Sequence, residues 1–364
     1  MKYKLTRRTA LAGMFAGATL VGCTPSDGSP VALPTPTDVP ADCVDLASFV
    51  FEHRGHCKPL TSLSDADIVR FDFPGSLVSD GSQLMAYFRN AVLAWDVTSG
   101  ALTSLHAPQR SDSWVFASRG NATVVPRCNG SLVVHADGCI ALELQGHEPE
   151  SSGSDWVGDG IQSLVFTGDD HLVSLGTDNS LRSWAVSTGE ALEMRRLDSR
   201  PDARVLWHDA AQGRLVLSHD LGRAVDIYHP TSLEHLQSYP ELPEISGGWR
   251  ATSEGVLVGI NATDQPNGLT VYDGNTNQTS AIGTETACRA FTVSSTGEIA
   301  YEDGSLVKIR ATDGTEREIV TQGTEFVSIE FSDNGDFLHV LDAYAGPRTY
   351  DVATGDVFTQ YELP

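Results

Sequence analysis

The sequence predicts an all-β fold, a seven-bladed β-propeller made of four-stranded blades. Three observations point to it. Short apolar runs are separated by Asp-Gly, Asn-Gly and Thr-Gly pairs, which is the pattern of strands and tight turns. A unit of about 40 residues recurs along the chain, and it carries turn signals at two places. Apolar residues rarely recur at helical spacing over the 364 residues.

The repeat aligns best on an aromatic residue followed by an acid, at the end of the expected third strand of each blade. The aligned positions are Trp95-Asp96, Leu142-Glu143, Trp184-Ala185, Tyr228-His229, Tyr272-Asp273, Ile309-Arg310 and Tyr350-Asp351. Neighbouring positions are 37 to 47 residues apart, the length of a four-stranded propeller blade. Seven positions predict seven blades, each of which needs its neighbours to bury both faces.

Turn-forming pairs mark the first hairpin of each unit. They are Asp80-Gly81, Asn129-Gly130, Asp169-Asp170, Gln212-Gly213, Glu254-Gly255, Thr296-Gly297 and Asn334-Gly335. A second series separates the expected second and third strands, and its clearest members are Asp137-Gly138, Asp178-Asn179, Asn267-Gly268 and Asp303-Gly304. Gly, Asn and Asp favour such turns because they tolerate positive φ.

An apolar residue usually lies five positions before the first-hairpin turn, where it would belong to a packing layer of inner strands. The series is Val124, Leu164, Trp207, Trp249, Phe291 and Ile329. Trp207 and Trp249 could instead stack on a ligand, but the register that they share with the other members favours the core.

These motifs resemble the WD40/YVTN-like repeat family from about residue 64 to residue 361. Trp95-Asp96 is the only literal Trp-Asp pair, and we find no Gly-His pair, usual in WD40 repeats, at the expected blade starts. The resemblance implies a propeller domain over residues 64–364. Two segments could complete its last blade: Asp356–Leu363 as an outer strand, or Ile68–Phe73 added from the N-terminal side.

The N-terminal segment predicts export. Four basic residues come first: Lys2, Lys4, Arg7 and Arg8. The apolar run that follows is too short to span a bilayer well. It ends in Leu20-Val21-Gly22-Cys23, which resembles the lipobox of bacterial lipoproteins. The resemblance implies a signal peptide over residues 1–22 and acylation of Cys23, with palmitate as one such lipid. Arg7-Arg8 resembles a twin-arginine export signal, and general secretion is the alternative.

Residues 23–42 are expected to form a disordered tether, because five prolines and no aromatic residue follow Cys23 there. The lipid and the tether together predict a domain anchored at the extracytoplasmic face of the cell membrane. Residues 43–63 are expected to be an N-terminal loop segment, in which Cys43 and Cys57 could form a disulfide. The pairing of Cys128, Cys139 and Cys288 stays open.

The charge disfavours one class of partner. The chain has 24 Lys and Arg residues against 48 Asp and Glu residues, and four of the basic residues lie in the expected signal peptide. An acidic surface of this kind repels phosphate backbones, so we expect no nucleic-acid binding.

No motif for catalysis or cofactor binding is found. The chain lacks G-x-S-x-G, P-loop, G-x-G-x-x-G, H-E-x-x-H and C-x-x-C-H sequences. We therefore expect no cofactor, no metal site and no enzymatic activity. The alternative is an extracytoplasmic enzyme, hydrolase-like or lactonase-like, with a site at the central channel that leaves no linear motif. The densest group of histidines is His208, His219 and His229.

The expected function is binding. The longest connection between blades, Gln145–Gly160, is acidic, rich in Gly and Ser, and carries Trp156. Long loops on rigid scaffolds often bind, and an exposed Trp is a good anchor. We take His147, Asp155 and Trp156 as candidate recognition residues, although Trp156 could instead pack on the third blade. The expected partner is a protein or a cell-envelope component.

Overall fold

The computed structural model describes residues 50–53, 56–59, 76–79, 82–88, 91–106, 116–119, 122–126, 130–136, 139–147, 160–197, 205–210, 212–220, 222–252, 255–262, 266–319, 326–332, 334–342 and 346–361. The expected signal peptide, the tether with Cys23, and Cys43 lie outside these ranges, so what the sequence predicts for them stays a prediction. Internal contacts divide the chain into Met1–Pro30 and Val31–Pro364, and every described residue belongs to the second unit. Within the described ranges no helix is long and apolar enough to cross a membrane.

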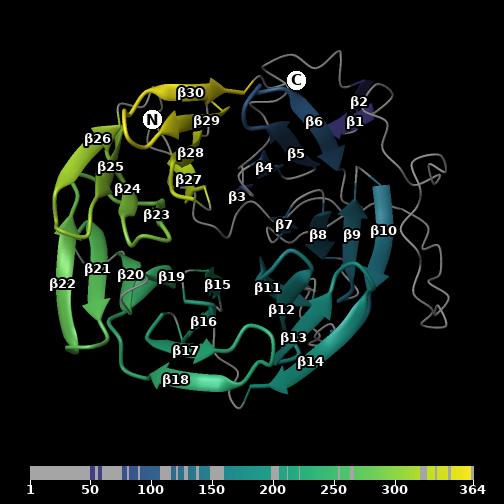
Figure 1. The fold of residues 1–364 in the computed structure, drawn as a ribbon, viewed down its shortest axis with the longest axis horizontal. Coiled ribbons are helices and arrows are strands. Elements are labelled where there is room, and N and C mark those ends of the chain that lie inside the picture. Colours follow the sequence, from purple (N-terminus) through teal and green to yellow (C-terminus); the bar gives the residue numbers. More distant parts are fainter. Residues whose placement is uncertain are drawn as a thin grey trace. The chain divides into compact units, whose positions relative to one another are not determined.

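The second unit confirms the seven-bladed propeller. Seven antiparallel sheets of four strands each follow one another along the chain, and within each sheet the strands are hydrogen-bonded in chain order. The sheets form a ring (Figure 1). The first strand of each sheet is innermost, and contacts between neighbouring first strands run the whole way round, from β3 through β27 and back to β3.

The strands occupy four layers, from the axis of the ring outward. The innermost strands are β3 (Ser76–Ser79), β7 (Ala117–Arg119), β11 (Ile161–Phe166), β15 (Val205–Asp209), β19 (Ile245–Ala251), β23 (Phe291–Val293) and β27 (Phe326–Phe331). The second strands are β4 (Gln83–Phe88), β8 (Ala122–Pro126), β12 (His171–Gly176), β16 (Arg214–His219), β20 (Val256–Asn261), β24 (Ile299–Asp303) and β28 (Phe337–Asp342).

The third strands are β5 (Ala91–Asp96), β9 (Leu132–Ala136), β13 (Ser180–Ala185), β17 (Ala224–Tyr228), β21 (Gly268–Asp273), β25 (Leu306–Arg310) and β29 (Gly346–Asp351). The outer strands are β6 (Leu102–His106), β10 (Cys139–Leu144), β14 (Glu190–Arg196), β18 (His235–Tyr239), β22 (Gln278–Gly283), β26 (Glu316–Ile319) and β30 (Val357–Gln360).

Burial falls from the middle of each blade to its rim. The second strands β12 and β28 are almost continuously buried, because neighbouring blades cover both of their faces. The outer strands β14 and β18 are almost entirely exposed. Between blades six and seven, for example, Ala300 and Ile309 pack against Phe331, Leu338 and Tyr350. Apolar burial of this kind, about 25 cal/mol per Å², is what holds one blade on the next.

The acid of the repeat motif closes the turn between the third and outer strands. Asp96 Oδ1 accepts the backbone N–H of Ser99 at 2.7 Å. Asp351 Oδ1 accepts the backbone N–H of Thr354 at 2.8 Å in the last blade. In blade four the ring nitrogen Nδ1 of His229 takes the place of the carboxylate, and accepts from two backbone N–H groups. The motif is therefore a turn-forming device.

The structure corrects the alignment of blade two. Leu142-Glu143 lie in the outer strand β10 and not at the end of the third strand. Asn129-Gly130 therefore precede the third strand β9, and Asp137-Gly138 follow it. The third strand ends at His135-Ala136, where neither a Trp or Tyr nor an acid marks the position. Val124 accordingly lies in the second strand β8, and not in an inner strand.

The alignment of blade six is wrong by one residue. The turn after its third strand is closed by the backbone bond from Ala311 N to Thr315 O. The matching bond in blade seven runs from Asp351 N to Asp356 O. Arg310-Ala311 therefore occupy the repeat position, and not Ile309-Arg310.

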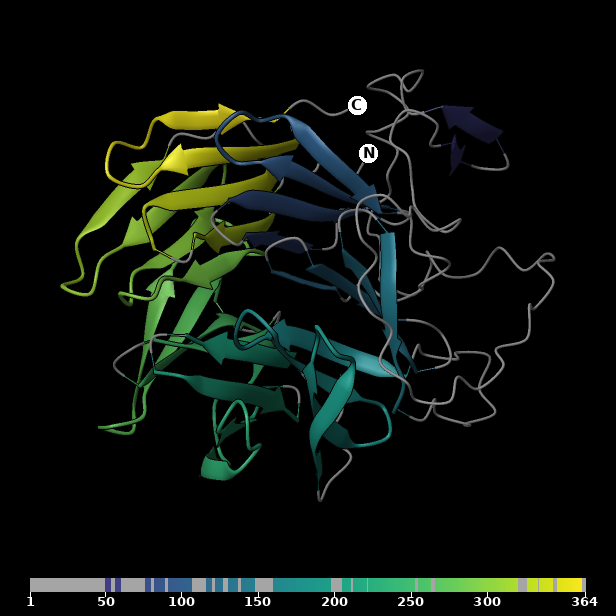
Figure 2. The same ribbon diagram turned by 45° about the vertical axis from the view of Figure 1, so that its right-hand side comes forward.

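The C-terminal strand completes the last blade, as the first of the two alternatives expects. β30 pairs with β29, while Ile68–Phe73 lie outside the described residues. The last blade then meets the first (Figure 2). At this boundary the Thr359 hydroxyl donates to Val97 O at 2.7 Å. The ring centres of Trp95 and Tyr361 are 5.8 Å apart across the same boundary. Side chains of the C-terminal segment therefore close the ring.

The segment 43–63 contains a short antiparallel hairpin, β1 (Val50–His53) and β2 (His56–Pro59). Cys57 lies in β2, but Cys43 is outside the described residues, so the disulfide stays a prediction. Cys288 is a buried free thiol, and burial raises its pKa to about 12. A thiol with so high a pKa is not reactive at neutral pH.

Candidate functional site

The candidate recognition loop begins where the outer strand of blade two ends. The structure describes its first three residues, up to His147, and resumes at Gly160. Asp155 and Trp156 lie outside the described residues, so their role stays a prediction. The side chain of His147 has an exposed fraction of 0%. This corrects the expectation that His147 is a recognition residue, because a buried ring offers no surface to a partner.

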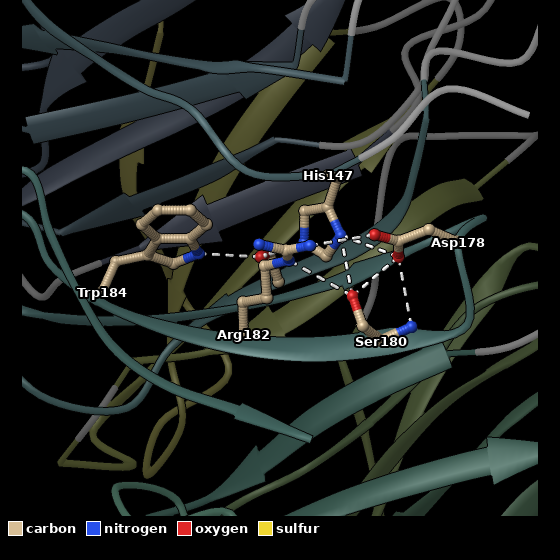
Figure 3. A network of polar contacts seen from close by, with 6 residues as sticks. His147, Asp178, Ser180, Arg182 and Trp184 are labelled. Atoms are coloured by element: carbon tan, nitrogen blue, oxygen red, sulfur yellow. Dashed lines mark hydrogen bonds and ion pairs between the residues drawn. The ribbon is translucent and has the colours of Figure 1, made fainter. Parts of the chain in front are cut away.

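Blade three holds His147 through both ring nitrogens (Figure 3). Nε2 lies 2.7 Å from the hydroxyl oxygen of Ser174 on β12. Nδ1 lies 3.0 Å from a carboxylate oxygen of Asp178, in the turn between β12 and β13. The same Ser174 oxygen accepts the indole N–H of Trp184 on β13 at 2.8 Å. We call these residues, with Ser180 and Arg182, the His147 network.

The outer part of the network holds Asp178 in place. Its Oδ1 accepts the backbone N–H of Ser180 at 3.1 Å and the Ser180 hydroxyl at 2.7 Å. Its Oδ2 accepts from Arg182 Nη2 at 3.2 Å, and Arg182 Nε donates to the Ser180 hydroxyl at 3.2 Å. The carboxylate thus has several donors, as a mostly buried charge requires.

These contacts assign the protons of the imidazole. An ionised Asp178 only accepts hydrogen bonds, so Nδ1 carries the ring hydrogen and Nε2 accepts from the Ser174 hydroxyl. Burial lowers the pKa of His147, and the hydrogen bond to the Asp178 carboxylate opposes this only in part. The ring is therefore neutral at pH 7, and both of its nitrogens have a partner.

Ser174, His147 and Asp178 stand in the order of a Ser-His-Asp catalytic triad, but the arrangement is closed. Ser174 has an exposed fraction of 0%. Its hydroxyl oxygen already accepts the Trp184 N–H. A nucleophile has to reach the substrate carbonyl, and solvent does not reach this hydroxyl. The network is structural: it fastens the chain that leaves blade two onto blade three.

Two glycines allow this close packing. A Cβ on Gly146 would lie 2.7 Å from both an Arg182 nitrogen and a Trp184 ring carbon. A Cβ on Gly176 would overlap the ring of His147. Gly146-His147 is therefore a Gly-His pair in the connection that leads to blade three, whose first strand begins at Ile161, although none was expected at the blade starts. This pair is the feature of the sequence from which the His147 network could have been predicted.

The two tryptophans of the inner-strand series differ in burial. Trp249 is fully buried, and its indole N–H donates to the backbone oxygen of Gly222, which confirms the core interpretation. Trp207 is only partly buried against the cluster between blades four and five. The register that Trp207 and Trp249 share in the sequence therefore placed both in inner strands, but it did not predict how exposed each side chain is.

Two of the three histidines in the densest group, His219 and His229, make separate contacts. His219 Nε2 lies 3.0 Å from Asp226 Oδ2, whereas His229 closes the turn after β17. His235 also faces Asp226, at 3.4 Å from its Oδ1. Across the part of the chain that the structure describes, no group of three His, Cys, Asp or Glu residues could hold a metal ion.

No protein-family model matches the sequence, and no curated protein matches it. The class of the protein therefore follows from the fold alone, which is a seven-bladed β-propeller. The His147 network fixes the start of the long connection Gln145–Gly160 on blade three through buried hydrogen bonds. The function has to be argued from that base and from the sequence.

Proposed function

We propose that the protein is a membrane-anchored, extracytoplasmic lipoprotein that serves as a binding scaffold for another protein or for a component of the cell envelope. The lipobox-like sequence that ends in Cys23 supports the anchor. The proline-rich residues 24–42 support a tether between the lipid and the propeller. The acidic balance of the chain supports a partner other than nucleic acid.

The observation that carries the binding role is the anchored base of the candidate recognition loop. His147 is hydrogen-bonded at both nitrogens to blade three, so the loop starts from a fixed point on the ring. A loop whose base is fixed loses less conformational entropy on binding than a free segment does. Residues 148–159, with Asp155 and Trp156, would then make the contacts.

We also infer a WD40-like relationship, which blade three supports best. It has Gly146-His147 before its first strand and Trp184 at the end of its third strand. A second Gly-His pair, Gly55-His56, precedes blade one in the sequence, and the other blades keep the turn chemistry without such a pair. The relationship therefore rests on these two pairs and on the fold.

Photo-crosslinking of the lipidated protein in its native membrane tests the binding role. The wild-type chain should capture a reproducible partner, and deletion of Ser151–Asp155 should abolish the capture. A matched control of constant length replaces Asp155 and Trp156 by Ser, because residues 151–154 are already Ser and Gly. If the control also loses the partner, the side chains bind; if it keeps the partner, loop length is what matters. Capture of the same partner by a folded deletion variant would contradict the proposal.

The anchor has a separate test. Cys23→Ala removes the thiol that would take the lipid, so the variant should leave the membrane fraction after export. Cys288→Ala is the matched control, because that thiol is buried in the propeller. A Cys23→Ala protein that stays in the membrane fraction would contradict lipid anchoring.

A further inference from the structure

Three polar side chains from three different blades meet at the innermost layer. Arg250, Thr292 and Glu330 are each the next-to-last residue of their inner strands β19, β23 and β27. Arg250 Nη1 donates to the Thr292 hydroxyl at 2.8 Å and lies 3.0 Å from Glu330 Oε2. The guanidinium of blade five thus reaches past blade six to blade seven. We call this group, with Phe291, the axial cluster.

Solvent reaches the axial cluster. The side chains of Arg250 and Glu330 have exposed fractions of 25% and 26%. Blades on either side cover both faces of an inner strand, so what remains exposed on such a strand faces the axis or an end of the ring. The cluster therefore differs from the closed His147 network, whose Ser174 has no exposed surface.

The guanidinium is held at one end only. All of its hydrogen bonds and ion pairs within the described residues use Nη1, which has two N–H groups. An arginine has five N–H donors, so the three on Nε and Nη2 have no partner there. The ring of Phe291 lies under the group, with its centre 5.4 Å from Arg250 Cζ. Phe291, Thr292 and Glu330 therefore hold the group in place and leave its Nε–Nη2 edge open.

An open Nε–Nη2 edge can bind a carboxylate through two hydrogen bonds at once. Two parallel N–H groups match the two oxygens of a carboxylate, and the paired bond is stronger and more directional than a single one. Glu330 cannot use this edge, because both of its oxygens lie on Nη1.

We propose that the axial cluster binds a small carboxylate ligand. Arg250 takes the carboxylate through Nε and Nη2, and Glu330 and Thr292 keep the guanidinium oriented. The site lies in the ring and is independent of the recognition loop and of the membrane anchor.

Isothermal titration calorimetry of the full chain in detergent with 3-phenylpropionate tests the proposal. Saturable one-to-one binding is expected, and 3-phenylpropanamide, which has the same body without the charge, should not bind measurably. Arg250→Lys keeps the charge but loses the paired donors, and should weaken binding about tenfold. Arg317→Lys, on the outer strand β26, is the matched control, and should keep the affinity within about threefold because Arg317 pairs with Glu298 away from the axial cluster.

Glu330→Gln separates a binding site from a mere brace between blades. It removes a negative charge close to the bound carboxylate, so the affinity for 3-phenylpropionate should rise about tenfold. Far-ultraviolet circular dichroism of each variant shows that the ring is intact. Absence of binding by the wild type, or equal affinity in wild type, Arg250→Lys and Glu330→Gln, would overturn the proposal.

Discussion

The His147 network and the axial cluster are both built around a nitrogen-rich side chain and a carboxylate. They differ in how many of their nitrogens have a hydrogen-bond partner. In the first, both nitrogens of His147 have partners, and Ser174 is inaccessible to solvent. In the second, Arg250 uses one of its three nitrogens and stays 25% exposed. The first therefore contributes to stability, and the second has donors left for a ligand.

The difference follows from where each group lies in a blade. The His147 network forms around the second and third strands, where the neighbouring blades exclude water and an unpaired polar group would cost about 1–3 kcal/mol. The axial cluster stands on inner strands, where water can satisfy an unpaired N–H until a ligand replaces it. Polar residues whose hydrogen bonds are all made within the protein are therefore structural, whereas residues that keep unpaired donors can bind a ligand.

The largest expected effect comes from His147→Ala. It leaves a cavity and removes the partner of Ser174 and Asp178, so the free energy of unfolding should fall by about 4 kcal/mol. Urea unfolding followed by tryptophan fluorescence measures it. His229→Ala, an exposed turn residue, is the control and should cost about 1 kcal/mol or less. A similar loss of unfolding free energy in the two variants would contradict the structural role of the His147 network.

The second effect concerns His339, a buried histidine that has a hydrogen-bond partner at only one ring nitrogen within the described residues. Its Nδ1 lies 2.8 Å from the Thr349 hydroxyl, and within the described residues Nε2 has no hydrogen-bond partner. Burial lowers its pKa from 6.5 to about 4. The unfolded chain therefore takes up a proton first as the pH falls. Stability is unaffected by this group above pH 7 and should drop by up to about 3 kcal/mol between pH 6.5 and pH 4.

Urea unfolding of wild type and His339→Gln across that pH range measures the effect. The variant should lose the part of the acid destabilisation that His339 contributes, since glutamine does not titrate. Identical pH profiles would show that His339 is not responsible. His339 would then have to find a partner for Nε2 that the described residues do not include.

The turn chemistry of the chain was enough to predict the blades, because positive-φ positions such as Gly213, Gly297 and Gly335 recur where first hairpins must close. Blade two was misaligned because its third strand ends in His135-Ala136, without the Trp or Tyr that marks this position in blades one, three, four, five and seven. The outer strand then supplied a false match at Leu142-Glu143.

The two polar clusters differ in how far the sequence could reveal them. Gly146-His147 lies 31 residues before Asp178, within the length of one repeat, so the pair could have been sought there. Arg250 and Glu330 are 80 residues apart and come from blades that are not neighbours. The curvature of the ring brings them together at the innermost layer, and no local pattern in the sequence records such a contact.

A smaller effect is expected at Asp226, whose carboxylate is hydrogen-bonded but only partly buried. Burial would raise its pKa, but hydrogen bonds from His219, Ser238 and His235 outweigh it and lower the pKa to about 2. Because the group is partly exposed, Asp226→Asn should cost about 1 kcal/mol at pH 7. The contribution is present above pH 3.8 and is lost as the pH falls towards 2.

Denaturant titrations at pH 7 and pH 2.5 compare Asp226→Asn with wild type. The difference between the two proteins should shrink at the lower pH. Asp273→Asn is a suitable control, since its carboxylate is an exposed turn acceptor. A difference that persists unchanged at pH 2.5 would contradict the assigned charge.

The smallest effect on stability is expected at the axial cluster. Arg250→Gln should reduce the free energy of unfolding by about 1 kcal/mol or less, since water replaces the lost contacts at a partly exposed site. Thermal unfolding by circular dichroism detects a change of that size as a shift of a few degrees in Tm. A loss as large as that of His147→Ala would make the cluster a structural brace.

Two double-mutant cycles, measured by urea unfolding under one set of conditions, test most directly whether completeness of hydrogen bonding separates the two clusters. One cycle pairs His147→Ala with Asp178→Ala, and the other pairs Arg250→Ala with Glu330→Ala. The coupling free energy should be about 2 kcal/mol for the first pair and below about 1 kcal/mol for the second. Equal couplings, or a larger one for Arg250 and Glu330, would contradict the account.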